Sequence, residues 1–233
     1  MKRVVSLALF LGVFLVNSAF STEFSADMII ETMGMKQQGK LYCKSEDLFR
    51  TEIMGMISIV QRPKIYNFLK NSKKYVVTDE RESAQKNPVS GVSNFQQWIE
   101  KNQVKKAGSE KIADYSCDIY EGDVQVSSDQ PMVHVKVWYS PELRYGLRFE
   151  ADTGGPVGTV AQELENIQVG NQKDELFTVP ADYTETDSML DAMGLGGLAS
   201  EKSQEKQGGA SSGEMKEELM KIMDNLMEQS GSN

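Results

Sequence analysis

Residues 132–139 read MVHVKVWY, and this stretch decides the fold class. Apolar side chains recur at every second position, and the side chains between them would point to the opposite face of an extended chain. A period of two is that of a β-strand with one covered face, whereas a helix repeats every 3.6 residues. The predicted covered face consists of Val133, Val135, Val137 and Tyr139. The stretch therefore predicts a strand of an antiparallel sheet.

The same period recurs on both sides of this strand, from Phe24 to about Tyr183. FSADMIIE (24–31) and RYGLRFEA (144–151) show it clearly, and NSKK (71–74) reads as a hairpin turn between two such runs. Runs separated by Gly, Asn, Asp or Pro give about ten strands. The fold class predicted is mainly β with minor α.

Two segments depart from this two-residue period. GVSNFQQWIEKNQ (91–103) has helical spacing after a possible cap at Ser93 or Asn94, and we expect a short helix that lies across the sheet. Its apolar positions are Val92, Phe95 and Trp98 or Ile99. GTVAQELENIQV (158–169) fits a helix through its spacing, but its place between strands favours a long strand.

The first 21 residues have the pattern of a signal peptide. Lys2 and Arg3 precede a 13-residue apolar run, and small residues follow it. That run is shorter than the roughly 20 residues that cross a bilayer. With no cysteine near the cleavage point, we expect a periplasmic protein without a lipid anchor. Removal of the two positive charges changes the formal charge from −9 to −11, which disfavours nucleic acid and anionic lipid surfaces as partners.

Cys43 and Cys117 are the two cysteines of the chain, and both fall on the apolar phase of predicted strands. In an oxidising compartment pairing is the default expectation, so we predict a disulfide. The alternative is two separate buried thiols.

After residue 185 the composition changes. Residues 186–213 form a Gly/Ser/Gln-rich linker with a short methionine-rich piece, and residues 214–229 predict an amphipathic helix. Its apolar stripe consists of Met215, Leu219, Ile222 and Leu226, widened by Met223 and Met227. Such a helix needs an apolar groove, either on a partner or on its own domain.

Several short motifs follow one another along the predicted strands. They are Gly39-Lys40, Arg50-x-Glu52, Arg62-Pro63, Lys74-Tyr75, KIADYSCDIY (111–120) and ELFTVPADYTE (175–185). In this order they resemble an uncharacterised family of exported bacterial proteins, the domain-of-unknown-function family of the 4412 type. That family is grouped with the LolA-like fold of periplasmic lipoprotein carriers. Asp114 stands where the family usually has glycine.

The resemblance implies one domain over residues 22–185. Its fold would be a curved antiparallel half-barrel with a short helix over the concave face. In the lipoprotein carriers that concavity is apolar and receives acyl chains. The chain lacks room for the N-terminal helix of the carriers, because the first predicted strand follows the signal peptide almost at once.

The tripeptide Met-Gly-Met occurs twice, in Met33–Met35 and in Met54–Met56. Thioethers are ligands that copper(I) favours, so Met33, Met35, Met54 and Met56 are candidate ligands if the two bends meet. The alternative, which we favour, is that they line or turn a curved sheet.

No pattern in the sequence points to catalysis or to a cofactor. His134 is the single histidine, and the chain has no GxSxG, HExxH or phosphate-binding glycine loop. We predict a non-enzymatic protein with no cofactor.

The expected function is binding of an apolar guest in the concavity, such as an acyl chain, a lipid or a lipidated polypeptide. The predicted contact residues are Met28, Ile30, Met54, Met56, Val135, Val137, Leu147 and Phe149. The helix at 214–229 could fold back as a displaceable lid. The alternative is an envelope scaffold whose C-terminal helix docks on another protein.

Overall fold

The computed structural model describes residues 22–79, 95–125, 132–152 and 158–193. The first half holds β1 (Phe24–Thr32), β2 (Met35–Ser45), β3 (Leu48–Ile53), β4 (Met56–Gln61), β5 (Lys64–Leu69) and β6 (Lys74–Asp79). It is followed by α2 (Phe95–Asn102), β7 (Lys105–Ile112), β8 (Tyr115–Val124), β9 (Val133–Ser140), β10 (Tyr145–Asp152) and β11 (Thr159–Val169). A 3₁₀-helix η2 (Asp174–Phe177), the short strand β12 (Thr184–Glu185) and α3 (Met189–Ala192) come last.

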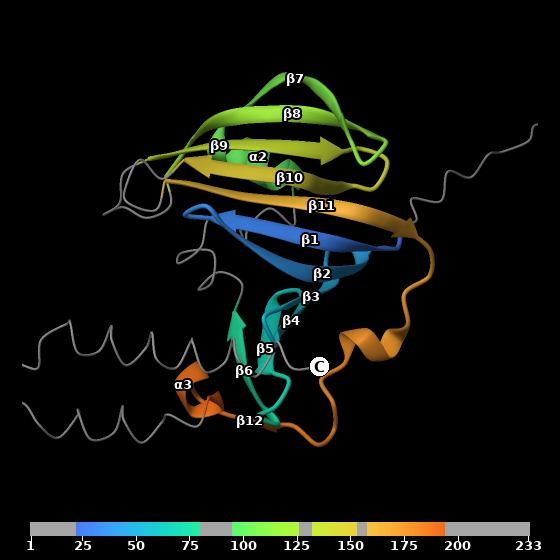
Figure 1. Ribbon diagram of the computed structural model, residues 1–233, viewed down its shortest axis with the longest axis vertical. Helices are drawn as coiled ribbons and strands as arrows, with labels where there is room; N and C mark the ends of the chain where they lie inside the picture. Colours follow the sequence, from blue (N-terminus) through green and yellow to red (C-terminus); the bar gives the residue numbers. More distant parts are fainter. Residues whose placement is uncertain (1–21, 80–94, 126–131, 153–157, 194–233) are drawn as a thin grey trace, which may run out of the picture.

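All of these strands belong to one twelve-stranded sheet, in the order β12-β6-β5-β4-β3-β2-β1-β11-β10-β9-β8-β7. Two meanders, β1–β6 and β7–β11, are joined where β1 pairs with β11. Every pairing is antiparallel except that of β12, which runs parallel to β6. In Figure 1 the strands from β7 to β2 form one layer, and β3–β6 turn away from it. The mainly β class predicted from the sequence is confirmed, with twelve strands instead of about ten.

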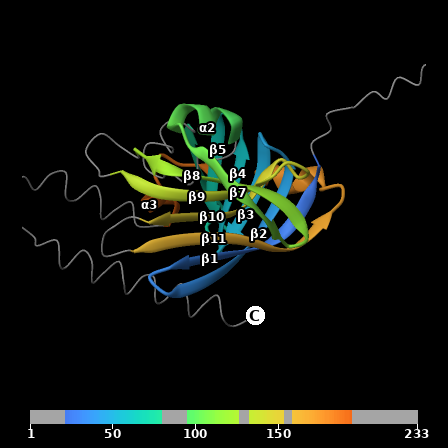
Figure 2. The same ribbon diagram turned by 90° about the horizontal axis from the view of Figure 1, so that it is seen from above.

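The helix α2 covers one face of the β7–β11 half. Phe95 stacks on Tyr139 of β9 with ring centroids 4.1 Å apart, and Trp98 is buried beside it. Seen from above, α2 lies on the side of β8–β10 toward which β4 and β5 extend (Figure 2). We call this side the concave face. The helix predicted across the sheet is confirmed, and so is the strand at 158–169, which is β11.

The opposite face of β3–β5 is covered by the segment that contains η2. Phe177 is buried against Ile59 and Phe68. Arg50 Nη1 donates to the carbonyl of Leu176 at 3.0 Å, which fixes this segment to β3. The sheet is therefore covered on one face by α2 and on the other by η2, over different strands.

Cys43 and Cys117 are buried free thiols in the same core cluster. Each Sγ already donates to a nearby carbonyl, that of Ser45 at 3.5 Å and that of Tyr115 at 3.7 Å. Burial is the main cause that raises the pKa of Cys43 to about 12 and that of Cys117 to about 11. The disulfide that we predicted is not formed in the structure. Because each thiol has an acceptor within its own strand region, the packing is satisfied without a bridge.

The signal peptide predicted at 1–21 lies outside the described residues, and so do most of the linker and the helix predicted at 214–229. The described part of the C-terminal region ends with α3 and Met193.

Candidate functional site

The two Met-Gly-Met segments are the turns of two hairpins, β1–β2 and β3–β4. Met33 and Gly34 have φ of 55° and 75°, and Met54 and Gly55 have φ of 50° and 76°. Positive φ at both central residues is the geometry of a type I′ turn, which suits the twist of a two-residue hairpin. Glycine adopts it freely, whereas a methionine at φ > 0 is uncommon because its Cβ crowds the backbone. Methionine therefore occupies this position in both turns, although asparagine or glycine adopts positive φ at a lower energetic cost.

The exposed apolar side chains gather at this end of the sheet. Five of the seven large exposed apolar residues in the described ranges are methionines next to turns or strand ends at this edge. They are Met33, Met35, Met54, Met56 and Met132, with exposed fractions of 62, 60, 45, 39 and 57%. We call this edge the methionine rim.

The two hairpins diverge below their tips. The pairing of β2 with β3 ends at Gly39–Ile53, whereas the pairing of β1 with β2 continues to Thr32–Met35. At Gly39 the strands approach so closely that a Cβ would lie 2.6 Å from the carbonyl oxygen of Glu52. A glycine is required here, because any side chain would push the strands apart. Gly39 is the point from which the hairpins separate.

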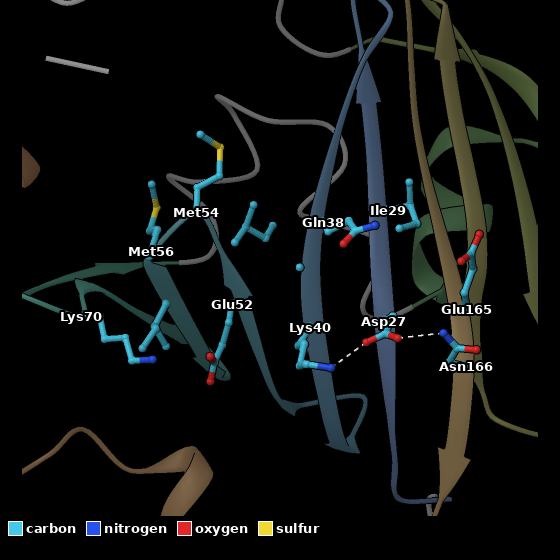
Figure 3. A pocket seen from close by; sticks show the side chains of 14 residues that line it. Asp27, Ile29, Gln38, Lys40, Glu52, Met54, Met56, Lys70, Glu165 and Asn166 are labelled. Carbon is cyan, nitrogen blue, oxygen red and sulfur yellow. Dashed lines mark hydrogen bonds and ion pairs between the residues drawn. The ribbon is translucent and has the colours of Figure 1, made fainter. Parts of the chain in front are cut away.

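An open pocket of about 750 Å³ occupies the notch between the hairpins (Figure 3). Its apolar lining comes from Ile29, Ile53, Met54, Met56 and Ile57. Its polar lining comes from Asp27, Gln38, Lys40, Glu52, Lys70, Glu165 and Asn166, and Gly39 and Gly55 complete it.

The two kinds of lining are unevenly distributed. Figure 3 shows Met54, Met56 and Ile29 toward one end of the pocket, together with the polar Gln38, and Lys70, Glu52 and Lys40 toward the other. The pocket is thus amphipathic, with its apolar part next to the methionine rim.

Charges at the polar end are held in a fixed arrangement. Lys40 Nζ donates to Asp27 Oδ1 at 2.7 Å, and Asn166 Nδ2 donates to Asp27 Oδ2 at 2.8 Å. The hydrogen bond from Lys40, together with that from Asn166, lowers the pKa of Asp27, and the same contact raises the pKa of Lys40. Both groups therefore stay charged and engaged with each other at neutral pH. This arrangement suits recognition of a polar headgroup better than proton transfer.

The strand register tells which predicted contact residues share a face. Phe149 lies opposite Val137 and Gln162, and Gln162 lies opposite Ile30. Leu164 lies opposite Met28. The predicted set Met28, Ile30, Val135, Val137, Leu147 and Phe149 therefore shares the concave face.

Most of these six side chains are buried in the described part of the chain. Val135, Val137 and Phe149 pack under α2, and Met28 and Leu147 are buried in the central core. Ile30 is half-buried. These six residues do not line the notch pocket, whereas Met54 and Met56 do. The role of the six as ligand contacts stays a prediction.

Sequence reasoning missed the polar lining of the pocket. Asp27 and Ile29 alternate with the apolar positions of β1, and Lys40 lies opposite Asp27 on β2. The predicted contact residues were chosen from the apolar positions of these strands. The alternate, polar positions were interpreted as solvent-exposed surface. The sequence feature that could have indicated this site is the pair of hairpins, which have the same Met-Gly turn but strands of unequal length.

The four candidate copper(I) ligands are divided by the notch. Met54 and Met56 line the pocket, but Met33 and Met35 do not. Copper binding by these four residues stays a prediction. Within the described ranges, no three or more His, Cys, Asp or Glu side chains form a group suited to a metal ion.

His134 lies on β9, on the face that does not carry α2. Its Nδ1 is 2.9 Å from Asp123 Oδ1, and its Nε2 is 3.1 Å from Glu121 Oε1. The hydrogen bond with Asp123 is the main cause that raises the pKa of His134. Two carboxylates across the β8–β9 ladder thus favour the imidazolium.

No family model and no curated protein matches the chain. Among solved structures, the chain is similar to an uncharacterized conserved protein from Thermus thermophilus, with a TM-score of 0.48 and 13% identity over 72% of this chain and 91% of that one. It is also similar to a LolA superfamily protein from Nitrosomonas europaea, with a TM-score of 0.40 and 12% identity over 68% and 90% of the two chains.

A third similarity is to the MucA/MucB complex of Pseudomonas aeruginosa, with a TM-score of 0.39 and 9% identity. It covers 70% of this chain but only 57% of the matched chain. At these values, conclusions about function rest on the residues of this chain. The 4412-type family assignment stays a prediction. None of the helices in the described ranges has the length and apolar character needed to cross a membrane.

Proposed function

We propose that this protein is a non-catalytic binding protein of the bacterial periplasm that holds an amphiphile in the notch pocket. The observation that carries the proposal is the amphipathic lining, with Met54, Met56 and Ile29 toward one end and the paired charges of Lys40 and Asp27 toward the other. The periplasmic location rests on the signal peptide predicted at residues 1–21. An acyl chain, a lipid or a lipidated polypeptide has the required division into apolar and polar parts.

The size and chemistry of the pocket support this class of ligand. A volume of about 750 Å³ lies within the roughly 300–1,000 Å³ of small-molecule sites. Methionine is unbranched and flexible, so Met54 and Met56 can adapt to guests of different shape. Asp27 and Lys40 offer both charges at the polar end, which favours a zwitterionic or neutral headgroup over a strongly anionic one.

The notch is a better location for the ligand than the concave face beneath α2. Val135, Val137 and Phe149 form one buried cluster with Phe95 and Trp98 of α2, and a guest there would have to displace the helix. Met54 and Met56 are exposed before any guest binds, so covering them gains apolar burial without repacking the core.

Titration with an environment-sensitive apolar dye tests the proposal. Replacing Met54 and Met56 together by Gln should weaken dye binding about tenfold, since losing roughly 1.4 kcal/mol of apolar burial corresponds to that factor. The matched control replaces Met33 and Met35 by Gln, in the same turn type outside the pocket lining. An equal loss of dye affinity in both double variants, or no loss of dye affinity in either, would contradict binding in the notch.

Native mass spectrometry of the protein from the periplasm separates the remaining alternatives. A co-purifying lipid supports the binding function. A stoichiometric protein partner without lipid would instead support an envelope scaffold with a docking C-terminal helix. Copper(I) that survives dialysis, and is lost when all four turn methionines become leucine, would support the metal site.

A further inference from the structure

The described part of the chain ends beside the notch pocket. β12 pairs with β6, and α3 packs against β5 and β6. Lys74 Nζ donates to the carbonyl of Asp191 at 3.2 Å, so α3 is fixed near the beginning of β6. Ser188 caps α3, with its hydroxyl accepting from the amide of Asp191 at 3.1 Å. The C-terminal tail therefore leaves from a fixed point at Met193.

The same corner of the sheet holds the pocket. The amide of Lys70 donates to the carbonyl of Gly55 at 3.0 Å, and Lys70 and Gly55 both line the pocket. The hydroxyl of Tyr183, just before β12, donates to the carbonyl of Lys70 at 3.0 Å. Lys70 and Lys74 are separated by four residue steps, at most about 15 Å of chain. The tail thus departs within a short distance of Lys70, at the polar end of the opening of the pocket.

The tail carries one segment suited to such an opening. Residues 214–229 place Met215, Leu219, Ile222 and Leu226 on one predicted helical stripe. The 21 residues between Met193 and Met215 are mostly Gly, Ser, Gln and charged residues. From this composition we expect random-coil dimensions, which for that length correspond to a root-mean-square span of roughly 25 Å, enough to reach the pocket.

We infer that the notch pocket is a docking site for the C-terminal segment 214–229 of the same chain, which competes with the external ligand. The inference rests on the proposed function, because the segment would occupy the same apolar lining, formed by Ile29, Ile53, Met54 and Met56. Binding of an amphiphile displaces the segment, and release of the amphiphile lets it return. The tail thereby covers the exposed methionines of the empty pocket.

The linker makes this competition effective even if the segment binds weakly. A tethered segment reaches an effective concentration on the order of 1 mM when its linker matches the span. If its intrinsic dissociation constant is about tenfold below that concentration, the tail weakens the apparent affinity for an external ligand by about tenfold.

Substitutions in the full-length chain test the inference. Leu219→Gln with Ile222→Gln removes the centre of the apolar stripe, whereas Glu217→Gln with Lys221→Gln changes only the polar face and serves as the control. The stripe variant should bind an apolar dye about tenfold more tightly than the natural chain. The control variant should bind it as the natural chain does. Equal dye affinity in all three proteins would overturn the inference and leave the proposed function intact.

Methionine methyl NMR gives a readout that does not depend on a ligand. In the stripe variant the signals of Met54 and Met56 should move, whereas those of Met33 and Met35 should not. Unchanged Met54 and Met56 signals would overturn the inference, whether or not the proteins bind dye. Absence of dye binding in all of the proteins would separately overturn the proposed function. Shifts that depend on protein concentration would assign the docking to the tail of a second copy and contradict docking within one chain.

Discussion

At the scale of single residues, Gly39 determines how the two hairpins separate. Its missing side chain lets the carbonyl of Glu52 approach β2, and a Cβ would meet that oxygen at 2.6 Å and Ile53 Cγ1 at 2.8 Å. The oxygen belongs to the backbone and cannot move without shifting the β2–β3 ladder. The pocket therefore depends on a residue that contributes no lining side chain.

Gly39→Ala should lower the free energy of unfolding by about 1–3 kcal/mol, the usual range for an overpacked site. Thermal or denaturant unfolding measures the effect. Gly170→Ala is the control, since nothing lies within 4 Å of the added Cβ. If both variants unfold alike, the close approach at Gly39 is not a constraint on the fold.

The turn methionines allow a second prediction at this scale. Asn is favoured over methionine at positive φ, so Met33→Asn and Met54→Asn should each stabilise the fold by about 0.5–1 kcal/mol. Only Met54→Asn should also weaken dye binding, because Met33 does not line the pocket. Unfolding curves and dye titrations of the two variants, measured side by side, check both statements. A loss of stability in both would show that the methionines are retained for the fold itself.

At the scale of elements, the sequence was sufficient for most of the strands and for α2. The alternation in 132–139 predicted β9, and the helical spacing around Phe95 and Trp98 predicted α2. The two-residue strand β12 is too short to show any period. The notch could not be predicted. It arises because β2 extends beyond the residues that pair with β3, and the periodicity within one strand does not indicate how far its pairing with a neighbouring strand continues.

The β8–β9 ladder carries a pH dependence through His134. The hydrogen bond with Asp123 raises the folded pKa above the ordinary value of 6.5, so the folded state binds the proton more tightly than the unfolded chain does. This stabilisation is fully present below pH 6.5 and is lost as the pH rises through the folded pKa. Because the side chain is 49% exposed, the contribution should be only about 0.2–1 kcal/mol.

Comparison with His134→Gln isolates that contribution. The natural chain should exceed the variant in unfolding free energy at pH 5.5, and the difference should shrink toward pH 8.5. Urea titrations at the two pH values measure it. A difference that grows with pH would mean that His134 is held neutral in the folded state.

At the scale of the whole molecule, the core that contains the two thiols joins the two meanders. Its buried residues come from β1 and β2 on one side and from β7–β11 and the β9–β10 turn on the other. Because both thiols belong to this shared core, we expect them to become accessible together when the core unfolds.

Alkylation of Cys43 and Cys117 should consequently report global unfolding. Burial and a raised pKa, about 12 and about 11, both suppress the thiolate, so neither residue should react with iodoacetamide in the folded protein at pH 8. Across a urea transition the two should become modified together, and at the same midpoint as the loss of sheet structure measured by circular dichroism. Mass spectrometry of the intact chain and its peptides follows both sites. Early reaction of one thiol alone would show that the meanders open independently, and a mass about 2 Da lower before reduction would reveal a bridge formed in the oxidising compartment.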